Sequence, residues 1–178
     1  MKLNLGCGRR RLEGDGWVNV DMFSHPNVDV VHDLNVFPYP FDDGCADYIF
    51  INHVLEHLVN PYDVMLECHR LLKAGGVVEV VVPHKNSLSA FDIAHRCFFT
   101  ERSMCHLLDA GKDVGVGVHG VDGFSGSSLQ CHGLFKLLLC RVKRLIPTPW
   151  GYLPGFNVYK NAVGIGIRTE ICWKLKKN

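Results

Sequence analysis

Short apolar runs separated by polar, glycine-rich stretches dominate the first half of the chain. Runs of this length are typical of β-strands, and their alternation with helical segments is typical of an α/β domain with a parallel sheet. The last run is almost entirely β-branched, as expected of a strand that is covered on both faces. The predicted strands are Lys2–Leu5, Val18–Val20, Val28–Val31, Asp47–Ile51 and Val77–Val82.

Two segments carry the apolar spacing and end signals of α-helices. The first is Pro61–Lys73, where Asn60 is a suitable N-cap and proline occupies the first helical position. The second is Glu101–Ala110, with Thr100 as its predicted N-cap. The predicted helix terminators are Gly75 or Gly76 for the first helix and Gly111 for the second.

The second half of the chain is less regular. Residues Asp109–Gly133 are rich in glycine, and a loop of that length in a compact domain is often a lid or a substrate-binding segment. Phe135–Leu145 and Ala162–Leu175 then predict two long strands that form an antiparallel closing pair. The expected architecture is one α/β domain over residues 1–178, with a mostly parallel seven-stranded sheet.

Composition narrows the class of protein. The chain of 178 residues is 47% hydrophobic and 21% charged with a net charge of +1, which gives no global electrostatic footprint for nucleic acid. The eight cysteines include no C-x-x-C pair, so we expect reduced thiols in a cytoplasmic protein. No signal peptide and no apolar run of membrane-spanning length is visible.

The chemistry begins at the turn Gly6-Cys7-Gly8, which follows the first strand, and at Asp21, which ends the second. Two glycines let the backbone approach a bulky ligand closely, and a carboxylate at a strand end can accept hydrogen bonds from ribose hydroxyls. This layout predicts an adenosine-containing cofactor. A dinucleotide fingerprint would need a third small residue where the chain has Arg11, and residues 9–17 are too short for a normal crossover helix.

A family resemblance rests on six segments that occur in order: LNLGCG, GWVNVD, HDL, YPFDDGCADYIFINHVLEHL, LLKAGGVVEVVVP and HRCFFT. In this order and spacing the chain resembles the class I S-adenosylmethionine-dependent methyltransferases. It is most similar to the compact type-11-like group that lacks an extended first helix. The resemblance implies a single Rossmann-like domain, with a cofactor half over about residues 1–83 and a substrate loop and closing strands over about residues 84–178.

The resemblance also implies roles for individual residues. The turn after the first strand would line the methionine portion of S-adenosylmethionine, Asp21 would hold the ribose, and Asp33 would accept from the adenine amine. From the residues alone, Asp33 could instead form a simple Asx turn. The cofactor-binding residues that the resemblance implies are Leu5, Gly6, Cys7, Gly8, Asp21, Met22, Asp33, Leu34, Asn52 and His53.

Three histidines are candidates for a general base: His53, His57 and His95. The segment from His53 to His57 also reads as H-x-x-E-H, an inverted zinc-protease motif. A protease would need a longer helix and a third ligand from a following helix, whereas Asn60-Pro61 ends this segment after about one turn. We therefore expect no metal, and we expect Glu56 and His57 to form hydrogen bonds around the cofactor.

The favoured hypothesis is methyl transfer from S-adenosylmethionine to a small-molecule or saccharide acceptor by in-line displacement. The first alternative is a non-catalytic S-adenosylmethionine-binding module on the same fold, and the second is a zinc metalloprotease. Neither a nucleic-acid partner nor a membrane span is indicated, and the sequence does not determine the oligomeric state.

Overall fold

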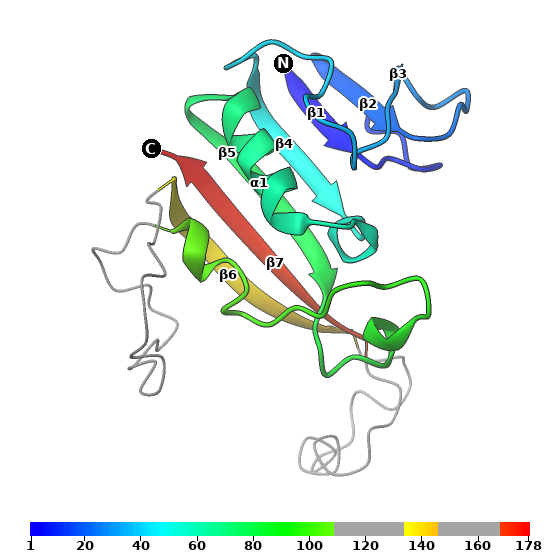
Figure 1. Ribbon diagram of the computed structural model, residues 1–178, viewed down its shortest axis with the longest axis vertical. Helices are drawn as coiled ribbons and strands as arrows, with labels where there is room; N and C mark the ends of the chain where they lie inside the picture. The colour runs from blue at the N-terminus through cyan, green and yellow to red at the C-terminus, as the bar shows by residue number, and fades with distance from the viewer. Residues whose placement is uncertain (109–133, 146–167) are drawn as a thin grey trace.

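The computed structural model describes residues 1–108, 134–145 and 168–178. In this part of the chain seven strands form one sheet in the order β3-β2-β1-β4-β5-β7-β6 (Figure 1). The described helical elements are one α-helix, α1 (Pro61–Leu71), and three short 3-10 turns, η1 (Leu55–His57), η2 (Leu88–Phe91) and η3 (Cys105–Leu107). The strands are β1 (Lys2–Leu5), β2 (Trp17–Asp21), β3 (Val30–Val31), β4 (Ala46–Asn52), β5 (Leu72–Pro83), β6 (Phe135–Leu145) and β7 (Arg168–Lys177).

The expected strand directions are confirmed. Strands β1 to β5 pair in parallel, and β7 is inserted antiparallel between β5 and β6. The carboxyl ends of the parallel strands therefore meet at one edge of the sheet, which is where parallel α/β sheets bind ligands. The predicted strand Ala162–Leu175 is observed as Arg168–Lys177, while residues 162–167 and the predicted loop 109–133 lie outside the described residues.

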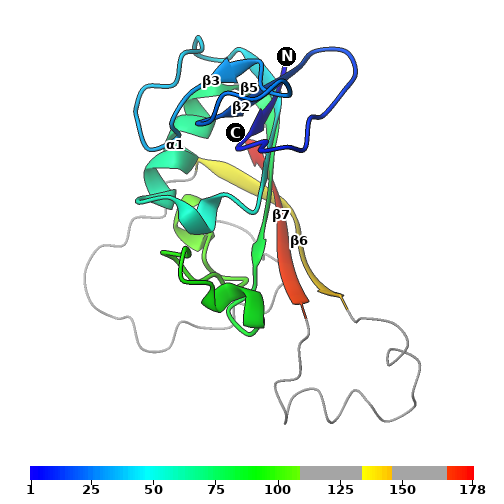
Figure 2. The same ribbon diagram turned by 90° about the vertical axis from the view of Figure 1, so that its right-hand side faces the viewer.

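Different layers cover the two faces of the sheet. Helix α1 and the turns of residues 84–108 lie on one side, and the loop between β1 and β2 lies on the other (Figure 2). The hydrophobic core includes alternate, fully buried residues of the central strands together with the buried face of α1. Burying a side chain of this size contributes about 1.5–3 kcal/mol, so this layer holds the strands in register. Its members include Leu3, Leu5, Ile49, Ile51, Val78, Val80, Val64, Met65 and Leu71.

The start of α1 is as predicted, but its end is not. The Asn60 side chain accepts a hydrogen bond from the Tyr62 N–H at 3.1 Å, as an N-cap should. The predicted glycine terminator is wrong, because the helix ends at Leu71 and the next residue, Leu72, pairs with Ala46 at the start of β5. Gly75 and Gly76 therefore lie within a strand of twelve residues.

The predicted helix Glu101–Ala110 is also wrong over its described part. Residues 101–104 form a turn, η3 follows, and Leu108 forms an isolated bridge with Phe135. Met104 and Leu107 are each only 3% exposed, so the apolar spacing reflects packing against the core. Strand pairing by Leu108 takes the backbone out of a helical path before a second helical turn can form.

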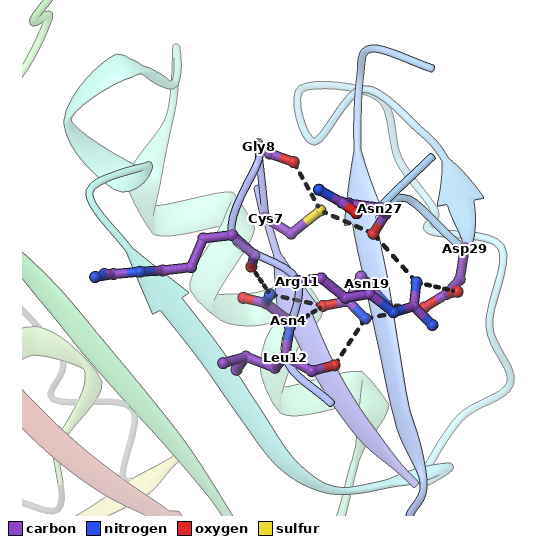
Figure 3. A network of polar contacts seen from close by, with 9 residues as sticks. Asn4, Cys7, Gly8, Arg11, Leu12, Asn19, Asn27 and Asp29 are labelled. Atoms are coloured by element: carbon purple, nitrogen blue, oxygen red, sulfur yellow. Dashed lines mark hydrogen bonds and ion pairs between the residues drawn. The ribbon is translucent and has the colours of Figure 1, made fainter. Parts of the chain in front are cut away.

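On the face of β1 and β2 opposite α1, a network of polar contacts covers the sheet (Figure 3). Asn4 and Asn19, which point away from the apolar core on β1 and β2, are 5% and 0% exposed. The Asn19 amide group donates to the Leu12 carbonyl at 3.1 Å and to Asp29 Oδ2 at 3.0 Å. Its oxygen accepts from the Leu12 N–H at 2.9 Å and from the Asn4 amide at 2.8 Å. The loop that carries the glycine turn is thus fixed to the sheet by hydrogen bonds.

Asp29 gives this network a pH dependence that can be tested. The backbone and side-chain N–H groups of Asn19 and the Arg11 guanidinium lower the pKa of Asp29 to about 2. A carboxylate with a lowered pKa stabilises the fold above its unfolded pKa and loses that contribution as pH falls toward the folded value. We expect the urea midpoint of the wild type to exceed that of Asp29→Asn at pH 6, and the difference to shrink between about pH 4 and pH 2.

The exposed Asp15, in the loop between β1 and β2, provides the matched control. Asp15→Asn is expected to leave the urea midpoint nearly unchanged at both pH values. A pH-independent difference between the wild type and Asp29→Asn would show that the carboxylate charge does not stabilise the loop.

Candidate cofactor and active site

The glycine turn after β1 is packed between the ends of β2 and β4. The N–H groups of Gly6 and Cys7 both donate to the Val20 carbonyl, at 2.8 and 3.0 Å. Gly6 has φ +70°, in the left-handed region that favours glycine. A methyl group added at Gly6 would lie 2.8 Å from Val54 Cγ1 and nearer still to Cγ2. The first glycine is therefore required both by the backbone and by the segment after β4.

Asp21, at the end of β2, is fixed against this turn. Its Oδ2 accepts a hydrogen bond from the Gly8 N–H at 2.7 Å, and its Oδ1 accepts from the Phe23 N–H at 3.0 Å. The residue is 8% exposed, and the next residue, Met22, is 52% exposed. Each carboxylate oxygen has a second lone pair, so Asp21 keeps capacity to accept bonds from a ligand.

The loop after β3 joins the same edge. The His32 N–H donates to the Asp21 carbonyl at 2.9 Å, and the Asn35 side chain accepts from the Val59 N–H at 2.9 Å. Asp33 Oδ1 accepts from both the backbone and the side-chain N–H groups of Asn35, at 2.9 and 3.0 Å. The Asx turn is therefore present, and it leaves the second oxygen of Asp33 for other partners. Leu34, the neighbouring predicted contact, is buried.

His53 follows Asn52 at the end of β4 and lies between two carboxylates. Its Nδ1 is 3.2 Å from Glu56 Oε1 and its Nε2 is 3.1 Å from Glu170 Oε1. The hydrogen bond with Glu56 raises the pKa of His53 above its ordinary value. Burial opposes this shift, and the contact with Glu170 adds to it. The backbone φ of His53 is +55°, a strained value for a non-glycine residue and one that is concentrated at functional sites.

The other two candidate bases lie together, but not as the H-x-x-E-H pattern suggests. His53 and His57 do not share a helical face, because the segment between them is only the 3-10 turn η1. The His57 ring instead packs edge-on against His95, with ring centroids 4.6 Å apart and planes at 75°. One ligand atom from each of Glu56, His57 and His95 lies within 4.8 Å of the others.

Sequence reasoning missed Glu170 as a partner of His53. Glu170 carries no motif and reaches the site because β7 pairs with β5, so that Glu170 lies opposite Pro83. No local sequence signal could have placed Glu170 beside His53, since these two residues are far apart in the chain. Of the predicted cofactor-binding residues, Leu5 and Cys7 are buried, with exposed fractions of 0% and 5%.

Comparison with known proteins agrees with this geometry. Residues 17–80 match the protein family described as a methyltransferase domain. A crystal structure of an S-adenosylmethionine-dependent methyltransferase from Archaeoglobus fulgidus superimposes with a TM-score of 0.61 and 14% identity, covering 99% of this chain and 85% of that one. This chain has the class I methyltransferase fold.

Two further matches bear on the same methyltransferase fold. The 1,6-didemethyltoxoflavin-N1-methyltransferase of Burkholderia thailandensis, solved with its substrate and S-adenosylhomocysteine, has a TM-score of 0.56 and 16% identity, covering 99% of this chain and 70% of that one. A probable S-adenosylmethionine-dependent methyltransferase of Mycolicibacterium smegmatis is 34% identical over 65 residues, which are 36% of this chain and 25% of that protein. The matched segments span a third or less of the curated relatives' length.

The predicted resemblance to class I S-adenosylmethionine-dependent methyltransferases is thus confirmed, and with it the predicted fold. Within the described residues, no helix is both long and apolar enough to cross a bilayer.

Proposed function

We propose that this methyltransferase fold binds S-adenosylmethionine and transfers its methyl group to a small-molecule or saccharide acceptor by in-line displacement. The observation that carries the proposal is the hydrogen bond from the Gly8 N–H to the Asp21 carboxylate. This bond joins the glycine turn, whose backbone a ligand can approach closely, to the carboxylate at the end of β2. These are the two features that predict binding of an adenosine cofactor. The structural neighbour from Burkholderia thailandensis is an N1-methyltransferase with bound 1,6-didemethyltoxoflavin, which supports a small-molecule acceptor.

In this proposal the turn Gly6–Gly8 lines the methionine portion of the cofactor, and Asp21 accepts from the ribose hydroxyls. Asp33 and Leu34 border the adenine, with Met22 beside it. Bound S-adenosylmethionine supplies an electrophilic methyl group, so the protein has to align the acceptor and exclude water.

For a hydroxyl acceptor, His53 is the candidate base that its partners support best. It follows Asn52 at the carboxyl end of β4, and Glu56 and Glu170 both contact its ring. In this proposal the acceptor hydroxyl displaces Glu170 from His53 Nε2, which then accepts the hydroxyl proton, and the Glu56 carboxylate at Nδ1 stabilises the imidazolium that forms. An amine or thiol acceptor would not need this step.

A calorimetric titration with S-adenosylmethionine and S-adenosylhomocysteine tests the cofactor, and release of S-adenosylhomocysteine in a screen of acceptor classes tests the reaction. We expect saturable binding of both compounds and turnover with at least one hydroxylated small molecule or sugar. Binding without turnover for any acceptor would favour the alternative of a non-catalytic module. Absence of binding at millimolar cofactor would refute both.

Asp21→Ala is expected to weaken the binding of S-adenosylhomocysteine at least tenfold, because charge-assisted hydrogen bonds to the ribose are lost. The variant also frees the Gly8 N–H, so the turn is held less firmly. Calorimetry measures the affinity, and circular dichroism confirms that the variant is folded. The control is Asp42→Ala, an exposed aspartate in the connection before β4. Equal affinity of Asp21→Ala and the wild type would refute the ribose role.

We further propose that residues 1–178 act as one domain, with the cofactor half over about residues 1–83 and the acceptor half over about residues 84–178. We also propose a cytoplasmic location, which the thiols of Cys7, Cys45, Cys68 and Cys97 support because none of these four is in a disulfide.

A further inference from the structure

The strongest unassigned feature is the cluster of Glu56, His57 and His95, beside the proposed cofactor site. Glu56 is 1% exposed, and its Oε2 is the one buried side-chain oxygen or nitrogen in the described residues that has no hydrogen-bond partner. A buried carboxylate oxygen without a partner is costly, and binding of a cation is one way in which a protein offsets that cost. The ligand atoms of two imidazoles lie within 4.8 Å of a carboxylate oxygen here.

The hydrogen bonds of the two histidines leave one nitrogen of each ring available. His57 Nδ1 is 3.2 Å from the Ala94 carbonyl, and His95 Nδ1 is 3.2 Å from the Ala90 carbonyl. A carbonyl accepts only, so each Nδ1 carries a proton, and in the neutral ring each Nε2 offers a lone pair. Metal-binding histidines are oriented in this way, by donating the other ring N–H to a backbone carbonyl or a carboxylate.

The carboxylate is oriented in the same manner. Glu56 Oε1 is in contact with His53 Nδ1, which leaves Oε2 as the oxygen without a partner. The segment that carries His95 is fixed directly to Glu56, since the N–H groups of Arg96 and Cys97 donate to the Glu56 carbonyl at 2.7 and 3.3 Å. All three side chains therefore have defined positions before any ligand arrives.

We propose that Glu56, His57 and His95 form a binding site for a divalent transition metal such as Zn²⁺. Two histidines and one carboxylate are a common set for catalytic zinc, which keeps a fourth position open. Bond lengths of about 2.0–2.2 Å place ligand atoms roughly 3.4 Å apart, so small side-chain rotations close the site. His57 is exposed and His95 half-buried, so the metal is reached from solvent.

This site differs from the H-x-x-E-H interpretation of the sequence. His53 supports Glu56 and does not bind the metal, and the third ligand comes from His95, about forty residues downstream. If the proposed methyl transfer holds, the open position suits an oxygen of the acceptor, because the cluster lies next to His53. That last step rests on the proposed function, whereas metal binding by itself does not.

The test is titration of the full chain with Zn²⁺ after chelation and removal of the chelator, with a reductant present. We expect one equivalent to bind in calorimetry and to raise the melting temperature. We expect His57→Gln and His95→Gln each to weaken binding at least tenfold. Glu56→Gln should also weaken Zn²⁺ binding at least tenfold. If this variant of a buried residue does not fold, the two histidine variants still test the site, because His57 is exposed and His95 is half-buried. The control is His25→Gln. His25 is exposed and lies in the connection between β2 and β3, so this variant should bind Zn²⁺ as the wild type does.

Titration with Co²⁺ identifies the ligands by absorption. Visible bands without thiolate charge-transfer absorption support a nitrogen and oxygen site, whereas thiolate bands would overturn the proposal in favour of cysteine binding. Wild-type affinity in His57→Gln and His95→Gln, or no binding at one equivalent, would overturn it as well. A parallel titration with S-adenosylhomocysteine distinguishes this failure from failure of the proposed function, because cofactor binding is expected without metal.

Discussion

Replacing Gly6 by alanine is expected to destabilise the protein by about 3 kcal/mol or more. The left-handed backbone at φ +70° costs an L-residue roughly 1–2 kcal/mol. The added methyl group would also overlap with Val54, and overpacking of this kind typically costs about 1–3 kcal/mol more. The turn can relieve the overlap only by moving away from β4, which would also separate it from the proposed cofactor position.

Two variants separate the steric cost from the backbone cost. Gly14 has φ +104° and no heavy atom within 4 Å of an added methyl group, so Gly14→Ala should show backbone strain alone. In Gly6→Ala/Val54→Ala the overlapping side chain is removed, and part of the lost stability should return. Urea unfolding followed by circular dichroism measures all of them. If Gly6→Ala costs no more than Gly14→Ala, close packing of the turn is not what selects glycine.

The existence of every observed strand could be predicted, because the apolar run at its centre is a local signal. Phe135–Leu145 was predicted with its observed bounds, and Lys2–Leu5 likewise, since apolar runs bounded by turn residues fix both ends. The antiparallel closing pair followed from two long consecutive strands. Errors arose where pairing with a distant strand determines the local structure. Leu72 leaves α1 to pair with Ala46, and Leu108 pairs with Phe135, and neither partner is close in sequence.

The same distinction between local and distant signals applies to the residues of the candidate site. The glycine turn and Asp21 could be predicted because a strand end and its following turn are neighbours in sequence. The contact of Glu170 with His53, and the meeting of His95 with Glu56, depend on how the chain returns to the same edge. Asn19 is a further case, since a polar residue in an apolar strand gives no sign that four hydrogen bonds will bury it.

A second large loss of stability is expected on replacing Arg70. This residue lies on α1, and its side chain binds the connection between β3 and β4. Its guanidinium donates to both oxygens of Glu67, at 2.9 and 2.5 Å, and to the Tyr39 and Phe41 carbonyls at 3.2 and 2.9 Å. Glu67 is 8% exposed and also accepts from the Tyr39 N–H at 2.7 Å. Burial raises the pKa of Glu67, but Arg70 and that N–H together lower it below its usual value.

Arg70→Met is expected to destabilise the protein by about 3 kcal/mol at neutral pH, because it leaves the Glu67 carboxylate buried without a cation. The loss should be smaller near pH 4, where Glu67 without Arg70 takes up a proton, as the linkage between pKa and stability requires. Glu67→Gln/Arg70→Met removes the unpaired charge and should recover part of the stability. Arg102→Met, at an exposed position, is the control and should change the urea midpoint little. A loss that is equal at both pH values, and that the double variant does not reduce, would assign the effect to lost packing of the arginine side chain instead of to the buried charge.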